Sequence, residues 1–171
     1  MLLSACGKRS GLCELPEADD ALRAALALKM TRWQKNAEYA GIENFETEVN
    51  QVINELVIAK NDFYRGDNES CTCATKIQFS DHEQFMETIA APVAKVKAEE
   101  HPMNSAYLRV EEQISYLENE GLEFFYVLNK KMDGSLEAQQ TYRLILQPQV
   151  SDAGKILFDY MEYRQKAELT Q

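Results

Sequence analysis

The sequence predicts a single α+β domain in which a long N-terminal helix packs on a curved antiparallel sheet of hairpins. Apolar residues recur at helical spacing over residues 16–40, whereas most later segments alternate apolar and polar residues around polar turns. The length of 171 residues suits one hydrophobic core better than two. We therefore expect one domain over residues 16–171, preceded by a tether over residues 1–15.

The predicted helix over residues 16–40 carries one apolar stripe on an otherwise polar surface. Asp19 near its start and Lys35 near its end match the helix dipole, and Gly41 is a natural C-terminal stop. The stripe consists of Leu22, Ala25, Leu26, Trp33 and Ala37.

A hairpin follows the helix. Residues 44–56 fit helix and strand about equally, and we expect a strand over 53–65, a turn at 66–68 and a returning strand over 70–80. With a period of two, one face of the returning strand is predicted to point into the core. That face consists of Cys71, Cys73, Thr75, Ile77 and Phe79.

The rest of the chain is predicted to be mostly strand. Its expected elements are a short helix near 81–90, a strand over 108–116, a central strand over 122–131 and a half-exposed strand over 136–146. Residues 155–166 fit a strand by their aromatic content and a helix by their apolar spacing. We favour a helix there, with Ser151 as its N-terminal cap.

The net charge of −10 excludes some partners. It arises from 28 acidic against 18 basic residues, so the surface repels phosphate backbones and anionic lipid headgroups. We therefore expect no nucleic-acid partner. No stretch approaches the roughly 20 apolar residues that span a bilayer, so a membrane link would have to be covalent.

The N-terminal stretch Leu3-Ser4-Ala5-Cys6 resembles a bacterial lipobox. In lipoproteins of that class the cysteine thiol takes a diacylglycerol and the signal peptide is cut before it. The resemblance implies lipidation of Cys6 and a location in the bacterial cell envelope, and Gly at position 7 implies the outer membrane, facing the periplasm. Only five residues precede Cys6, too few for a signal peptide. Either the true start lies upstream, which makes these residues a truncated signal remnant, or the match is accidental.

The remaining cysteines are Cys13, Cys71 and Cys73. A disulfide between residues i and i+2 of an extended strand is strained, so a bridge from Cys13 to one of the other two fits better. Such a bridge would pin the tether to the sheet, and an oxidising envelope would maintain it. The odd cysteine would then be buried or would pair between chains.

Neither a metal nor a cofactor is expected. A Cys-x-Cys redox centre would need an exposed thiolate near a cation or a helix N-terminus, and a zinc site would need further ligands. His82 and His101 are the only histidines of the chain, and no metal-ligand spacing occurs around them.

One helix followed by antiparallel hairpins, with a cysteine in the second strand, resembles the cystatin-like or NTF2-like domains of some small bacterial lipoproteins. The residues that carry this resemblance are 17–40, 54–79 and 114–146. It implies that the helix packs across a curved sheet whose concave side can hold a ligand. Because a fold does not define a function, no site residue is transferred.

The leading hypothesis is a lipid-anchored, non-catalytic binding or interaction module with a protein partner, such as an accessory subunit, an inhibitor or an immunity-type protein. A small-ligand carrier and an envelope enzyme are the alternatives. The carrier would line a concave face with Trp33, Phe124, Phe125, Tyr126 and Tyr142. The enzyme would use Asp81, His82 and His101, or Glu111 with Glu112, although such residues are more often caps and solvated charges.

Overall fold

The computed structural model of the chain describes residues 11–35, 38, 41–88, 121–140 and 150–168. The elements are a 3₁₀-helix η1 (Gly11–Glu14), helices α1 (Pro16–Thr31), α3 (Phe45–Glu55) and α6 (Val150–Glu168), and strands β1 (Leu56–Gly66), β2 (Ser70–Phe79), β3 (Leu122–Lys130) and β4 (Leu136–Gln140). A short helical segment covers 82–88. Among the described helices, none has both the length and the apolar character that crossing a bilayer requires.

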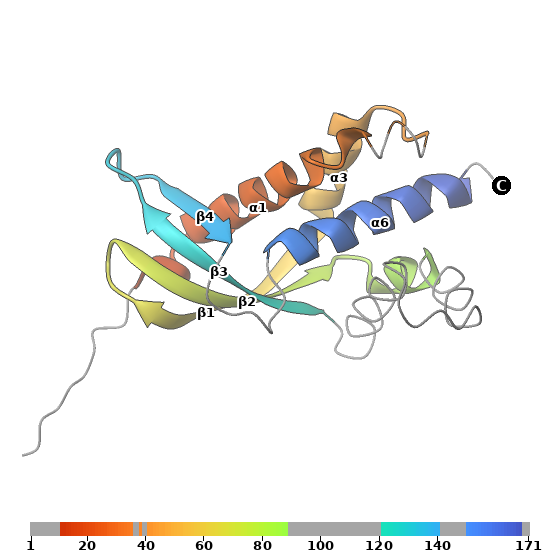
Figure 1. Cartoon of the computed structure of the whole chain (residues 1–171). Coiled ribbons are helices and arrows are strands. Elements are labelled where there is room, and N and C mark those ends of the chain that lie inside the picture. The colour runs from red at the N-terminus through yellow and green to blue at the C-terminus, as the bar shows by residue number, and fades with distance from the viewer. Residues whose placement is uncertain (1–10, 36–37, 39–40, 89–120, 141–149, 169–171) are drawn as a thin grey trace, which may run out of the picture.

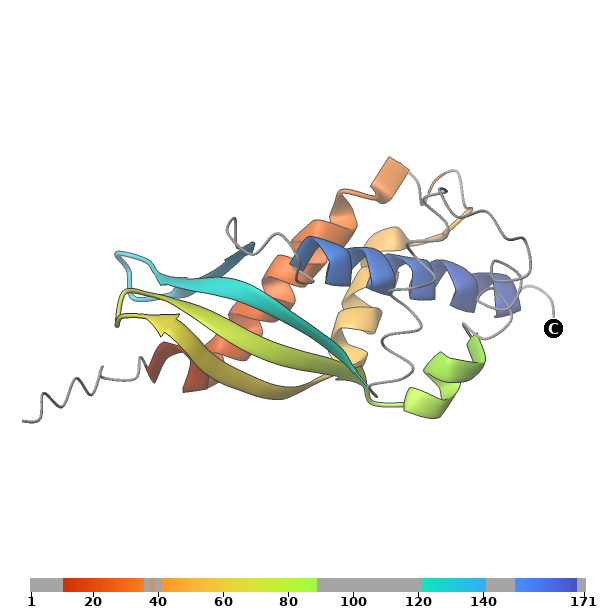
Figure 2. The ribbon, with the colours of Figure 1, turned by 60° about the horizontal axis from the view of Figure 1, so that its bottom comes forward.

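The four described strands form one antiparallel sheet in the order β1-β2-β3-β4. Helix α1 packs on β4, α6 packs on β3 and β4, and the two helices also pack against each other. They lie over the same face of the twisted sheet (Figures 1 and 2). The predicted α+β class is therefore confirmed.

Helix α1 begins as predicted but is shorter than predicted. Pro16 occupies its first turn, where a missing N–H costs nothing, and its apolar stripe is buried through Met30. The prediction of one unbroken helix to residue 40 is wrong, because the chain turns at residues 32–33, directly after Thr31; residues 34, 35 and 38 are helical again. The N–H of Trp33 bonds the carbonyl of Met30 at 2.9 Å, an i→i−3 bond that tightens the helix end. Trp33 then packs on Phe158 of α6, with ring centroids 5.9 Å apart.

The ambiguous segment before β1 is helical. Helix α3 buries Val49, Val52 and Ile53 on one face, and the strand starts only at Leu56, three residues later than predicted. The guanidinium of Arg23 in α1 explains where the change occurs. It donates to the carbonyl oxygens of Ile53 and Leu56, which satisfies backbone acceptors at the end of the helix.

Strand β2 matches its prediction closely. Exposure alternates along the strand, and the face from Cys71 to Phe79 is buried at every second residue. The turn before it is held by the Asp67 carboxylate, which accepts the N–H groups of Glu69 and Ser70 at 2.8 Å each. Gly66 is required at the end of β1, because a Cβ there would overlap the carbonyl oxygen of Ser70 and the Cα of Cys71.

Strands β3 and β4 form a second hairpin, and its turn contains Gly134 with a positive φ of 86°. Tyr126 and Leu128 of β3 point into the core, while Phe125 and Val127 are half-buried on the opposite face. The predicted strand over 108–116, and residues 141–146 of the last predicted strand, lie outside the described residues.

The C-terminal segment is a helix, as favoured from its apolar spacing. Ser151 is not its cap, because α6 already includes Val150. Gly154 brings α6 close to α1, since a Cβ at this position would lie 2.7 Å from the Cβ of Lys29. This close approach lets Leu157, Phe158, Tyr160 and Met161 fill the core.

A charged cluster joins α6 to α3 at the border of the core. Arg164 is only 8% exposed, and its guanidinium donates to both carboxylate oxygens of Glu55, at 3.0 and 3.1 Å, and to Glu48 at 2.8 Å. The Arg164 guanidinium also lies 5.6 Å from the centre of the Tyr160 ring. These bonds and the neighbouring negative charges raise the pKa of Arg164, although burial opposes them most strongly.

Candidate functional site

The N-terminal segment folds back onto the sheet. The four residues of η1 bury Leu12 and Cys13 and leave Glu14 exposed. The segment packs against β1 and β2, and the N–H of Leu15 bonds the carbonyl of Leu12 at 3.3 Å before α1 begins. Cys13 is thereby held over the core-facing side of β2.

Three sulfur atoms meet at this point. A disulfide joins Cys13 to Cys73. The Sγ of Cys71, which is not part of the disulfide, lies 3.2 Å from the Sγ of Cys13 and 3.6 Å from the Sγ of Cys73. All three residues are at most 2% exposed, so the cluster is closed to solvent. We refer to Cys13, Cys71 and Cys73 as the three-sulfur cluster.

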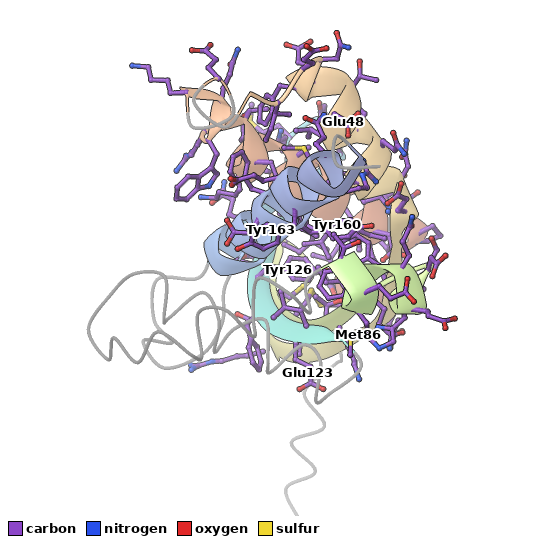
Figure 3. All side chains as sticks on the ribbon, turned by 90° about the vertical axis from the view of Figure 1, so that its right-hand side faces the viewer. Glu48, Met86, Glu123, Tyr126, Tyr160 and Tyr163 are labelled. Atoms are coloured by element: carbon purple, nitrogen blue, oxygen red, sulfur yellow. A yellow bond between two sulfur atoms is a disulfide. The ribbon has the colours of Figure 1, made fainter. Side chains whose placement is uncertain are left out.

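The surroundings of the cluster disfavour negative charge. Tyr126 lies opposite Cys73 across the β2–β3 ladder and is fully buried. Figure 3 shows Tyr126 and Tyr160 in the core between the sheet and α6. Burial raises the pKa of the Tyr126 hydroxyl well above its usual range, and the negative charges of Asp19 and Cys71 raise it further.

The three-sulfur cluster has the dimensions of a metal site but not its chemistry. The three sulfur atoms lie within 4.8 Å of one another, close enough to contact one ion. However, thiolates are the metal ligands, and in the disulfide two of the three sulfurs are oxidised. Reduction to three thiolates would also place their charge in an environment closed to solvent.

The predicted lipidation site, Cys6, lies outside the described residues. Cys13 and Cys73 are the bridged pair, and Cys71 is the odd cysteine, buried beside them. The structure therefore places these three predicted cysteines together.

Of the residues named for the enzyme alternative, the structure describes only Asp81 and His82. The Asp81 carboxylate accepts the N–H of Gln84 at 2.9 Å, so it caps the helical segment over 82–88. That segment packs Phe85 on Phe79, with ring centroids 4.7 Å apart. Of the other candidates, His82 is half-buried at the start of the segment, and His101, Glu111 and Glu112 lie outside the described residues.

The aromatic residues expected to line a carrier cavity do not share one face. Phe125 and Tyr126 are consecutive in β3 and point to opposite sides of the sheet, and Trp33 packs on Phe158 in the helical layer. Nothing is described of the side chains of Phe124 and Tyr142. The predicted common lining is therefore wrong for the three residues whose side chains are described.

Two features of the core were missed by the sequence reasoning. The partners of Arg164, Glu48 and Glu55, are more than a hundred residues away along the chain, so no local pattern could have linked them. The proximity of Asp19 and Cys71 to Tyr126 was also missed. The sequence of β3 is apolar on both faces, as in a central strand, and this pattern could have indicated that Tyr126 belongs to the core.

No protein-family model, no curated protein and no solved structure matches this chain. The resemblances to lipoproteins and to cystatin-like domains therefore rest on the residues of the chain itself.

Proposed function

We propose that the protein is an exported, lipid-anchored, non-catalytic binding module of the bacterial envelope. The observation that carries the proposal is the Cys13–Cys73 disulfide, buried beneath the N-terminal segment. Structural disulfides form and persist in oxidising compartments and are rare in the cytosol of most bacteria. The disulfide thus supports the export that the lipobox resemblance at Cys6 implies.

The position of the disulfide suits a protein held by its N-terminus. Cys6 and Cys13 are separated by about seven residues, whose full extension reaches about 25 Å. A lipid on Cys6 would therefore hold the domain close to the membrane surface. The crosslink from Cys13 to β2 transmits the attachment to the centre of the fold rather than to a loose chain end.

The lipid would anchor the protein even though its surface is acidic. Each buried CH₂ of an acyl chain contributes about 0.8 kcal/mol, and stable anchoring requires two chains or one chain with a second attachment. The net charge of −10 repels anionic headgroups, so the surface of the domain would not lie on the membrane and would stay free to bind a protein partner. Accessory subunits, inhibitors and immunity-type proteins all act through a surface that binds another protein.

Three observations bear on the binding role and the finer fold. Asp81, which was named for the enzyme alternative, caps a helical segment through its carboxylate. Large apolar side chains are exposed on α1 at Leu28 and at the tip of the β3–β4 hairpin at Met132, where a partner could contact them. Helices α1 and α3 precede the antiparallel hairpins and α6 follows them, so the helix-then-hairpins order of the cystatin-like resemblance is matched only in its coarse form.

Metabolic labelling with a fatty acid tests the proposal. The gene would be expressed in a bacterium with its own upstream in-frame codons, beside Cys6→Ala and Cys13→Ala variants. We expect label on the wild type and on Cys13→Ala, and none on Cys6→Ala. A wild-type protein that is made in full amount without label would contradict the lipid anchor.

A further inference from the structure

We propose that the three-sulfur cluster is an internal thiol–disulfide exchange site, in which the bond from Cys13 moves between Cys73 and Cys71. The proposal rests on the positions of the three sulfurs and not on the lipid anchor. It assigns Cys71, which has no part in the proposed function, the role of the exchanging thiol.

The register of β2 makes both partners reachable from Cys13. Cys71 and Cys73 are two residues apart and point to the same face of the strand, directly beneath η1. The Sγ of Cys13 is bonded to one of them and lies 3.2 Å from the other. Exchange therefore requires rotation of the cysteine side chains, whereas the backbone of β2 keeps the same face towards Cys13.

The exchange needs no external oxidant or reductant. The Cys71 thiol loses its proton, and its sulfur attacks the Sγ of Cys13. The Cys13–Cys71 bond forms as the Cys13–Cys73 bond breaks, and the Cys73 sulfur leaves with the electron pair and takes up the proton that Cys71 released, so the cluster gains no net charge. One disulfide and one thiol are present before and after the step.

Cys71 lies beside the disulfide rather than in line with it, since its sulfur is 3.2 and 3.6 Å from the two bonded sulfurs. The side chain must therefore turn before attack. Attack on Cys73 instead would join residues i and i+2 of an extended strand, which is strained. The favoured product is the Cys13–Cys71 isomer.

Burial of the cluster separates this internal exchange from reaction with solvent thiols. All three cysteines are at most 2% exposed, so a solution reductant meets the disulfide only after η1 opens. The backbone attachment point of the bond from Cys13 can meanwhile shift by two residues along β2, roughly 7 Å, towards the β1–β2 turn, although the two acceptor sulfurs are only 3.6 Å apart. The N-terminal segment stays crosslinked to the sheet in either isomer.

Thiol mapping of the purified full chain tests the exchange. The protein would be held without reductant at about pH 8, quenched in acid, and alkylated with N-ethylmaleimide in denaturant at mildly acidic pH, where exchange is slow. Peptide fragmentation between Cys71 and Cys73 then shows which thiol was alkylated. We expect both alkylated forms, in a ratio that does not change when the protein is diluted tenfold.

Alkylation of Cys71 alone, at every incubation time, would overturn the proposal. A ratio that changes with dilution would also overturn it, because the exchange would then be between molecules.

A pair of variants gives a second readout. Cys73→Ser should form the Cys13–Cys71 disulfide, whereas the control Cys71→Ser should keep Cys13–Cys73 and show no second isomer. A native Cys73→Ser protein in which Cys13 and Cys71 both stay reduced under oxidising conditions would contradict the exchange. If Cys73→Ser does not fold, the mapping of the wild type decides.

Discussion

Single side chains determine where elements of this chain end and how they join. The guanidinium of Arg23 accounts for the change from α3 to β1, because it binds the carbonyls of Ile53 and Leu56 at that point. Arg164 performs a different task, since it neutralises two glutamates between α3 and α6. In both cases one long side chain connects segments that are distant in sequence.

Removal of Arg164 should be costly. Arg164→Ala would leave Glu48 and Glu55, with side chains 20% and 27% exposed, without their cation. Breaking a buried pair costs about 3–5 kcal/mol, and the partial exposure of the glutamates lowers our expectation to about 2–3 kcal/mol. Urea unfolding measures this loss.

The matched control for that variant is Lys131→Ala. Lys131 lies 3.9 Å from Glu137, and both side chains are about half exposed. Its removal should cost less than about 1 kcal/mol. Equal losses for the two variants would contradict the structural role of the Arg164 cluster.

Tyr126 should make the protein sensitive to alkali. Its pKa is raised by burial, Asp19 and Cys71, so the neutral hydroxyl is favoured in the folded state. The resulting stability is complete below about pH 10 and is lost as the pH rises above that value, because an unfolded tyrosine ionises first. The Tyr126 contribution to this slope is at most about 1.4 kcal/mol per pH unit.

Tyr126→Phe should flatten the alkaline slope. The free energy of unfolding of the wild type, measured relative to that of Tyr126→Phe from pH 7 to 11, should fall as the pH rises, whatever their difference at pH 7. Curves that stay parallel to the end of this range would show that Tyr126 has no raised pKa.

At the scale of elements, the predictions succeeded where local chemistry decides the structure. Strand β2 and its turn follow from an alternating pattern and from Asp67 and Gly66, which act on their nearest neighbours. Helix α3 was left open because its apolar spacing runs directly into the β-forming residues after Glu55. The end of α1 was misjudged for a similar reason, since the apolar stripe continues to Trp33 although the backbone turns.

The contact between α1 and α6 depends on a glycine. In an open helix, Gly→Ala is stabilising by about 1 kcal/mol. At Gly154 the new Cβ would lie 2.7 Å from the Cβ of Lys29, so we expect Gly154→Ala to destabilise the protein by about 1–3 kcal/mol instead.

The sign of the stability change in Gly154→Ala distinguishes the gain in helix propensity from the overlap with Lys29. A Cβ at Gly11 would meet nothing within 4 Å, so Gly11→Ala serves as the control and should change the melting temperature little. A rise in the melting temperature of Gly154→Ala would show that the two helices are not in close contact.

At the scale of the whole molecule, the described residues place the N-terminal segment against the sheet near the β1–β2 hairpin turn (Figure 1). The strand period alone predicted that Cys71 and Cys73 face the core, and both do. The period could not determine which of them binds Cys13, because both point to the same face. The buried position of Tyr126 beside the cluster depends on the pairing of β2 with β3, which no local pattern contains.

The crosslink should also matter for stability. It closes a loop with a sequence separation of 60, and the chain-entropy model assigns such a loop about 4 kcal/mol. A bacterium that exports the protein would gain this stability, whereas a reducing cytosol would remove it.

The redox state of the cysteines in living cells therefore tests the account most directly. Cells would be quenched in acid, and the denatured protein would be treated with a maleimide of high mass, with Cys13→Ser measured in parallel. The account predicts one reactive thiol in the wild type, because Cys6 carries lipid and one disulfide is present, and two in Cys13→Ser. A wild-type protein that takes up four tags in cells would contradict the account, since all its cysteines would then be reduced and without lipid.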